Sequence, residues 1–191
     1  MGLFKAIKEF ISFRKKLKNS MQKFEKNLER YPALTTDELK ELPEDELFSA
    51  VLTRTEKAVD DFGDTYEDMV RGIEALPEKQ RIFYSVNYLD CEVNNGGLCQ
   101  FFTNDSRAVA PFISEYLGII GAADHKELFD RFIKKNNIDV KDLSSFDSNT
   151  VDEFLAQYER YPFDEYDDAF YELKPLEKYL TCFIKANIND F

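Results

Sequence analysis

One short stretch of the sequence combines the side chains that could take part in chemistry. Its distinctive residues are one acid, two glycines, two phenylalanines and three amides: Glu92, Asn95, Gly96, Gly97, Gln100, Phe101, Phe102 and Asn104. Amides neither titrate nor act readily as nucleophiles, so an enzyme here would need an acid, base or nucleophile from nearby. The candidates for that role are Glu92, Cys99, Asp105 and His125. Catalysis is therefore the minority interpretation, and we assign no catalytic residue.

The same stretch has two non-catalytic interpretations. Two adjacent glycines after a helical pattern allow a positive φ or the close approach of another helix. If the helix then resumes, Gln100 and Asn104 share one face and the two phenylalanines can enter the core. The amides would then form a polar clamp that satisfies buried groups at a helix break. The alternative is a small-ligand pocket floored by the glycines and lined by Asn95, Gln100 and Asn104.

Metal and cofactor sites have little support in the sequence. The three cysteines, Cys91, Cys99 and Cys182, include no close pair such as C-x-x-C, and His125 is the single histidine, so we expect no metal and no cofactor. Unpaired cysteines and the absence of a secretory signal favour the cytoplasm. The most apolar stretch, residues 108–123, is too short to span a bilayer.

The elements that must position this stretch are predicted to be helices. The chain has 191 residues with 18 Phe but only 7 Gly and 6 Pro, and this composition favours helix over sheet. We expect an all-α fold, a single compact multi-helix domain over residues 32–191 that follows an N-terminal helix in residues 1–31. The predicted helices are 3–30, 36–42, 43–62, 65–76, 78–94, 97–103, 108–120, 124–136, 150–160 and 175–188. Four N-cap pairs support these starts: Thr35 with Glu38, Asp64 with Glu67, Asp124 with Glu127, and Thr150 with Glu153.

Residues 1–31 form a basic arm. Apolar residues recur there at steps of three and four, which is typical of an amphipathic helix. The arm holds nine basic and three acidic residues. Three interpretations remain open: packing on the acidic remainder of the chain, a short coiled coil, or adsorption to an anionic membrane surface.

The remainder of the chain is strongly acidic. The whole sequence has 25 basic and 37 acidic residues, a net charge of −12, which argues against direct binding of nucleic acid. The densest window, residues 142–173, contains Arg160 as its one cation and ten acids: Asp142, Asp147, Asp152, Glu153, Glu159, Asp164, Glu165, Asp167, Asp168 and Glu172. Smaller clusters lie at residues 37–46 and 60–68. Each cluster could simply keep the protein soluble and complement helix dipoles.

Several local sequences resemble a bacterial family, the DMP19-like proteins. The resemblance covers about residues 77–191 and rests on these segments: Glu92-Val93, Asn95-Gly96-Gly97, Gln100-Phe101-Phe102, Asn104, Gly121-Ala122, Asp167-Asp168-Ala169-Phe170-Tyr171 and Leu180 to Phe191. Leu98 departs from the Phe that is common after the glycines. Membership implies an all-helical fold. The family is named after a DNA-mimic protein, an acidic body that occupies the DNA-binding surface of a partner.

Mimicry of DNA requires carboxylates spaced like phosphates. Residues four apart on a helix are separated by about 6 Å along its axis, close to the phosphate spacing of one strand. The residues that we expect to bind a partner are Asp152, Glu153, Asp164, Glu165, Asp167 and Asp168. The sequence therefore predicts a non-catalytic module that binds a protein, with a basic DNA-binding protein as the specific form. The alternatives are a small-ligand binder or enzyme at Asn95, Gln100 and Asn104, and a membrane-surface protein recruited by the arm. The sequence leaves the oligomeric state open.

Overall fold

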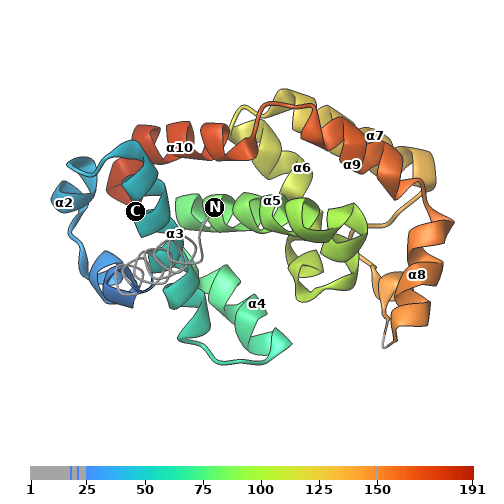
Figure 1. Cartoon of the computed structure of the whole chain (residues 1–191), viewed down its shortest axis with the longest axis horizontal. Helices are drawn as coiled ribbons and strands as arrows, with labels where there is room; N and C mark the ends of the chain where they lie inside the picture. The colour runs from blue at the N-terminus through green and yellow to red at the C-terminus, as the bar shows by residue number, and fades with distance from the viewer. Residues whose placement is uncertain (1–17, 19–20, 22–24, 149) are drawn as a thin grey trace, which may run out of the picture. The chain divides into compact units, whose positions relative to one another are not determined.

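The computed structural model describes residues 18, 21, 25–148 and 150–191, and within these it contains helices and no strand (Figure 1). The predicted all-α fold is confirmed for this part of the chain. The chain divides into two units, Met1–Lys57 and Ala58–Phe191. The predicted helix over residues 3–30 lies mostly outside the described residues, and the domain boundary after residue 31 stays a prediction.

The first unit is built on a short helix and the start of a long one. Its elements are the 3-10 turn η1 (Tyr31–Ala33), α2 (Thr36–Lys40) and α3 (Glu44–Asp60), which continues past the boundary. Thr35 caps α2, because its side chain accepts from the Glu38 amide while the Glu38 carboxylate accepts from the Thr35 amide. The Arg54 guanidinium donates to the Leu34 carbonyl at 3.1 Å and ties α3 to the turn before α2.

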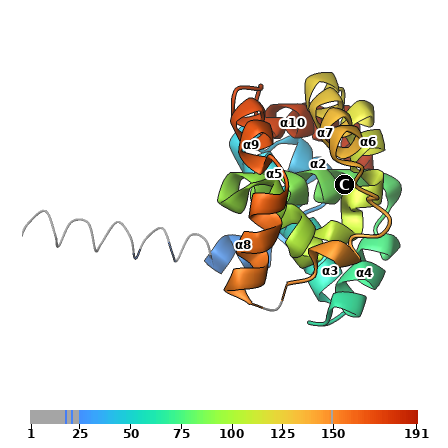
Figure 2. The same cartoon turned by 90° about the vertical axis from the view of Figure 1, so that its right-hand side faces the viewer.

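The second unit is arranged around its longest helix, α5. Its elements are α4 (Tyr66–Ala75), α5 (Glu78–Thr103), η2 (Asp105–Val109), α6 (Ala110–Ile119), α7 (Ala123–Asn136), η3 (Ser144–Phe146), α8 (Val151–Arg160), α9 (Phe163–Tyr171), α10 (Leu176–Ala186) and η4 (Ile188–Asp190). Helices α6, α9 and α10 all contact α5, and α7 lies beside both α6 and α9 (Figures 1 and 2). Helix α5 is therefore the central helix of the second unit, and the other helices pack around it.

A cluster of phenylalanines joins the end of α5 to the later helices. The ring of Phe102 lies 5.1 Å from Phe146 and 6.3 Å from Phe163, measured between centroids, and Phe163 lies 5.3 Å from Phe132. All four side chains are buried. Burial of a side chain of this size stabilises a fold by about 1.5–3 kcal/mol. The cluster holds α7, α9 and the η3 turn against α5, and it fixes where α9 meets the glycine pair.

The structure corrects several boundaries. Helix α9 was not predicted, although buried residues recur along it at steps of three and four. The regions 78–94 and 97–103 form one helix with a break, and the predicted helix 108–120 begins as the 3-10 turn η2. Two caps also differ: Thr65 with Asp68 caps α4, and Ala122 precedes α7 without a side-chain cap. The caps at Thr35 and Thr150 are confirmed.

Candidate functional site

Helix α5 is interrupted at its glycine pair. Gly96 has φ −154° and ψ 23°, and Gly97 has φ 79° and ψ 177°, whereas the helix continues on both sides. A Cβ on Gly97 would overlap the Asp167 carboxylate, whose Cγ would lie only 2.9 Å away, and a Cβ on Gly96 would overlap the Gln100 amide oxygen. Gly97 therefore requires glycine for its backbone angle, and a Cβ at either position would displace a side chain that contacts the break.

A buried carboxylate bridges the break from inside α5. Glu92 is 9% exposed, and its Oε2 accepts from Gln100 Nε2 at 2.6 Å and from Asn104 Nδ2 at 3.0 Å. These bonds join the segment before the glycines to the segment after them. The structure thus brings three of the predicted residues together, while Asn95 is exposed and takes no part. Phe101 and Phe102 are fully buried, as expected.

Helix α9 supplies a second set of bonds to the break. The Asp167 carboxylate accepts from the Leu98 amide at 2.9 Å, and the Tyr171 hydroxyl donates to the Val93 carbonyl at 2.7 Å. Both partners are backbone groups next to the glycines, where the regular helical pattern is interrupted. Sequence reasoning missed the role of Tyr171, although the segment 167–171 was part of the resemblance. The arrangement is a polar clamp from two helices, and we call it the α5–α9 clamp.

The titratable groups around the clamp are shifted mainly by burial. Desolvation raises the pKa of Asp167 to about 6; the Leu98 amide opposes the shift, and Asp164 and Asp168 add to it. Desolvation also raises the pKa of the Cys99 thiol to about 12, so this thiol is not activated as a nucleophile. His125 has its pKa lowered to about 4 by burial.

None of these groups forms a catalytic arrangement. His125 is 2% exposed, and its ring meets Phe170 and Tyr179 edge to face at 5.1 and 5.9 Å. Asp105 is exposed at the start of η2. Five hollows among the described residues are lined neither by Gln100 and Asn104, the two side-chain amides of the clamp, nor by Asn95. The geometry at Gln100 and Asn104 therefore favours a structural role over a ligand pocket.

Helices α8 and α9 carry most of the acidic window. Helix α8 has no buried residue, and it exposes Val151 and Leu155, at 74% and 50%, among its acids. We define the α8–α9 acidic surface as the exposed acids of the two helices: Asp152, Glu153, Glu159, Asp164, Glu165 and Asp168. Asp167, which was expected here, is 7% exposed and engaged in the clamp, so its carboxylate faces the interior.

Some charges of this surface already have partners within the chain. Lys135 of α7 pairs with Glu165 at 3.0 Å, and the Tyr158 hydroxyl donates to Asp164. Glu153 belongs to the cap of α8. Asp152, Glu159 and Asp168 have no ion pair with another described residue, and Asp164 keeps its negative charge because its partner is a neutral hydroxyl. Three of the aromatic residues between the acids, Phe163, Tyr166 and Phe170, are buried in the core. These three rings are not available to a partner.

The other acidic clusters are also partly occupied by internal contacts. Asp68 pairs with Arg71, and Asp37 pairs with Lys40 at 3.1 Å. Hydrogen bonds from Thr35 lower the pKa of Glu38, as expected for a capping carboxylate. Charge density along the sequence therefore overstates the number of carboxylates available to a partner.

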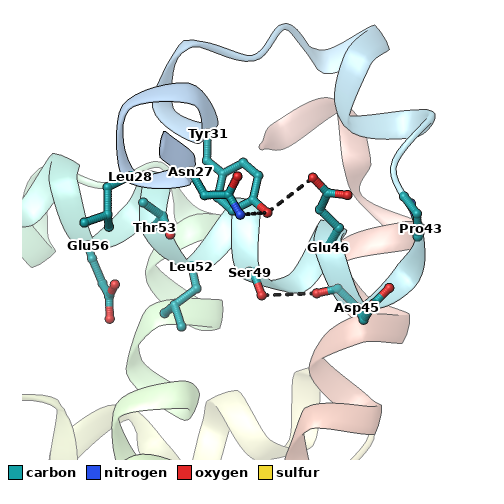
Figure 3. A pocket seen from close by; sticks show the side chains of 10 residues that line it. All are labelled: Asn27, Leu28, Tyr31, Pro43, Asp45, Glu46, Ser49, Leu52, Thr53 and Glu56. Atoms are coloured by element: carbon teal, nitrogen blue, oxygen red, sulfur yellow. Dashed lines mark hydrogen bonds between the residues drawn. The ribbon is translucent and has the colours of Figure 1, made fainter. Parts of the chain in front are cut away.

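The first unit contains a hollow of about 470 Å³, shown in Figure 3. A chain of hydrogen bonds crosses it, in which Asn27 donates to the Tyr31 hydroxyl at 2.8 Å and that hydroxyl donates to Glu46 at 3.3 Å. Glu46 also pairs with Arg30 at 2.7 Å. The Glu46 carboxylate is therefore already paired with a cation, and Asp45 and Glu56 are the other two acids that line the hollow.

Comparison with known proteins identifies the family. Residues 74–187, which include the clamped glycine break, match the family model described as DMP19-like protein. The chain therefore belongs to the DMP19-like family. The matched region includes α5 through α10, and so the whole α5–α9 clamp. No curated protein and no solved structure shows significant similarity to the chain.

Two further findings concern the alternatives. Across residues 18, 21, 25–148 and 150–191, no helix has both the length and the apolarity needed to cross a bilayer. The same residues contain no group of three His, Cys, Asp or Glu side chains placed to hold a metal ion. Recruitment to a membrane surface depends on residues 1–31, most of which lie outside the described part.

Proposed function

We propose that this protein is a non-catalytic binding module that uses the α8–α9 acidic surface to contact a basic protein. In the specific form of the proposal, the partner is a cytoplasmic DNA-binding protein whose nucleic-acid site is blocked. The observation that carries the proposal is helix α8: it buries none of its residues and exposes two aliphatic side chains, Val151 and Leu155, among carboxylates.

The chemistry of α8 suits a protein interface. Val151 and Leu155 are four residues apart and share one helix face, where they offer apolar contact area. The surrounding carboxylates steer a cationic partner toward that area, since charge complementarity raises association rates and excludes wrong partners. On α9, Asp164 and Asp168 are both exposed at the four-residue spacing that approximates neighbouring phosphates. These features support competition with DNA for a basic site.

Release of proteins from immobilised DNA tests the proposal. A bacterial lysate is bound to DNA-cellulose at low salt, and the column is then washed with the purified protein. We expect the protein to elute a subset of the bound DNA-binding proteins. Screening lengths fall from about 10 Å at 0.1 M salt to about 3 Å at 1 M, so direct complexes with the eluted partners should weaken steeply as salt rises.

Two variants with the same change in net charge assign the effect to its surface. Glu159→Lys with Asp168→Lys reverses two exposed acids of the α8–α9 acidic surface, and Glu41→Lys with Glu115→Lys reverses two exposed acids elsewhere. None of these four acids has an ion pair with another residue in the described part of the chain. The first variant should lose elution and the second should keep it. Equal elution by both variants, or complexes that persist unchanged at high salt, would refute the assignment.

A further inference from the structure

A second hollow, independent of the proposed function, lies within the second unit among α4, the start of α5, η2 and α6. Its volume is about 400 Å³, within the range of small-ligand pockets. Val70 and Ile73 of α4 form one side, and Phe112 and Tyr116 of α6 form another. Arg81 of α5 is the one cation of the lining. We call this cavity the α4–α6 hollow; Figures 1 and 2 label its helices.

Arg81 has unused hydrogen-bonding capacity at this hollow. Its Nη1 donates to the Glu74 carbonyl at 3.3 Å, and its Nε is buried without an acceptor. Among the described side chains it has no carboxylate partner. A buried N–H that lacks an acceptor lowers stability, so a ligand that supplies one would remove that cost. A guanidinium carries its N–H donors in a planar fork that matches the two oxygens of a carboxylate.

One aromatic side chain of the lining is largely exposed. Phe112 is 47% exposed, although its ring stacks on Tyr116 with centroids 5.8 Å apart and an interplanar angle of 18°. The lining combines this stacked pair with Val70 and Ile73 of α4. A flat or branched apolar group placed there would cover the exposed ring and gain from the area removed from water.

The lining also limits the charge of the ligand. Glu74 is the one acid of the lining, and it is exposed. A ligand with several negative charges would meet this carboxylate as well as the acidic remainder of the protein. A single carboxylate can bind Arg81 while the rest of the ligand stays neutral. From these contacts we propose that the α4–α6 hollow binds a small monocarboxylate with an aromatic or branched apolar body, held by Arg81 and by the Phe112–Tyr116 pair.

Titration with two matched probes tests this site. Calorimetry and NMR compare 4-phenylbutyrate with 4-phenylbutanol, which keeps the apolar body and lacks the charge. We expect the carboxylate to bind about tenfold more tightly than the alcohol, the factor typical of one charge-assisted hydrogen bond. Arg81→Met should remove this preference. Glu74→Gln should increase affinity for the carboxylate about twofold to threefold, because it removes a like charge near the surface.

A matched pair on α6 separates the hollow from general surface hydrophobicity. Phe112 and Ile119 are exposed to similar extents, 47% and 42%, but only Phe112 lines the hollow. Phe112→Ala should weaken 4-phenylbutyrate binding about fivefold or more, whereas Ile119→Ala should leave it unchanged. Absence of binding, equal binding of the alcohol, or equal effects of these two alanine variants would overturn the proposal. If circular dichroism shows that Arg81→Met does not fold, the test rests on Glu74→Gln and on the comparison of Phe112→Ala with Ile119→Ala.

Discussion

Replacement of Gly97 by alanine tests the α5–α9 clamp most directly. The substitution adds a Cβ at φ 79° and ψ 177°, a backbone region that is essentially restricted to glycine, where an L residue is strained by about 2 kcal/mol. The same Cβ overlaps the Asp167 carboxylate, which must move away from the Leu98 amide. Loss of a hydrogen bond to a buried carboxylate costs about 1.5–3 kcal/mol. The expected loss in free energy of unfolding is therefore about 3–5 kcal/mol.

Thermal unfolding followed by circular dichroism measures this loss. For a chain of this size, 1 kcal/mol corresponds to about 2–4 °C, so the midpoint should fall by about 6–20 °C. Gly121 is the matched control, because its φ is 80° and no atom lies within 4 Å of an added Cβ. Gly121→Ala should cost only the backbone strain, about 1–2 kcal/mol.

A double-mutant cycle isolates the overlap with the carboxylate. In an Asp167→Ala background the obstacle to the new Cβ is gone, so Gly97→Ala should cost only its backbone strain, about 2 kcal/mol. The clamp as described would be refuted if Gly97→Ala cost no more than Gly121→Ala in the unaltered protein. It would equally be refuted if the cost of Gly97→Ala were the same with and without Asp167.

Three further outcomes follow from buried groups. The pKa of His125 in the folded state is about 4, below its ordinary value of 6.5. Between these two pH values the unfolded state binds more protons than the folded state. The contribution of His125 to the free energy of unfolding is therefore lost as pH falls. In urea unfolding, the stability advantage of the unaltered protein over His125→Gln should shrink by about 2 kcal/mol from about pH 7 to about pH 4.5; an unchanged difference would contradict the shift. Glu92→Ala leaves two amide donors without their acceptor and should cost about 3 kcal/mol in urea unfolding, whereas Asn95→Ala should change stability by less than about 0.5 kcal/mol. Iodoacetamide labelling read by mass spectrometry should modify exposed Cys182 in the native protein and buried Cys99 only after unfolding, and rapid native labelling of Cys99 would contradict its burial.

The sequence predicts the helical class and the position of the break well, because both depend on local preferences. Glycine adjacency and the four-residue spacing of Gln100 and Asn104 are visible without a structure. The hydrogen-bond acceptor of these amides was not predicted correctly. The polar-clamp interpretation expected buried backbone groups, whereas in the structure the amides donate to the Glu92 carboxylate. That choice depends on how the helix turns at Gly96 and Gly97, which spacing alone does not define.

Long-range contacts account for what the sequence could not supply. Asp167 was grouped with its acidic neighbours, but packing of α9 turns it toward the Leu98 amide, 69 residues away in the chain. Helix α9 itself was not predicted because its acids dominate the pattern, although Phe163, Tyr166 and Phe170 mark its buried face. Arg81 carried no sequence signal, since its lack of an acceptor appears only after α4 and α5 are packed.

Helix α8 can vary in sequence more freely than the helices that form the core. The hydrogen bond from the Leu98 amide to Asp167 closes a long loop, and α8 lies within that loop of the chain without contributing a buried residue. Substitutions on α8 can therefore alter its outer face at little cost to the core. The outer face of α8, which we propose as a docking surface, can therefore change while the contacts between α5 and α9 stay the same.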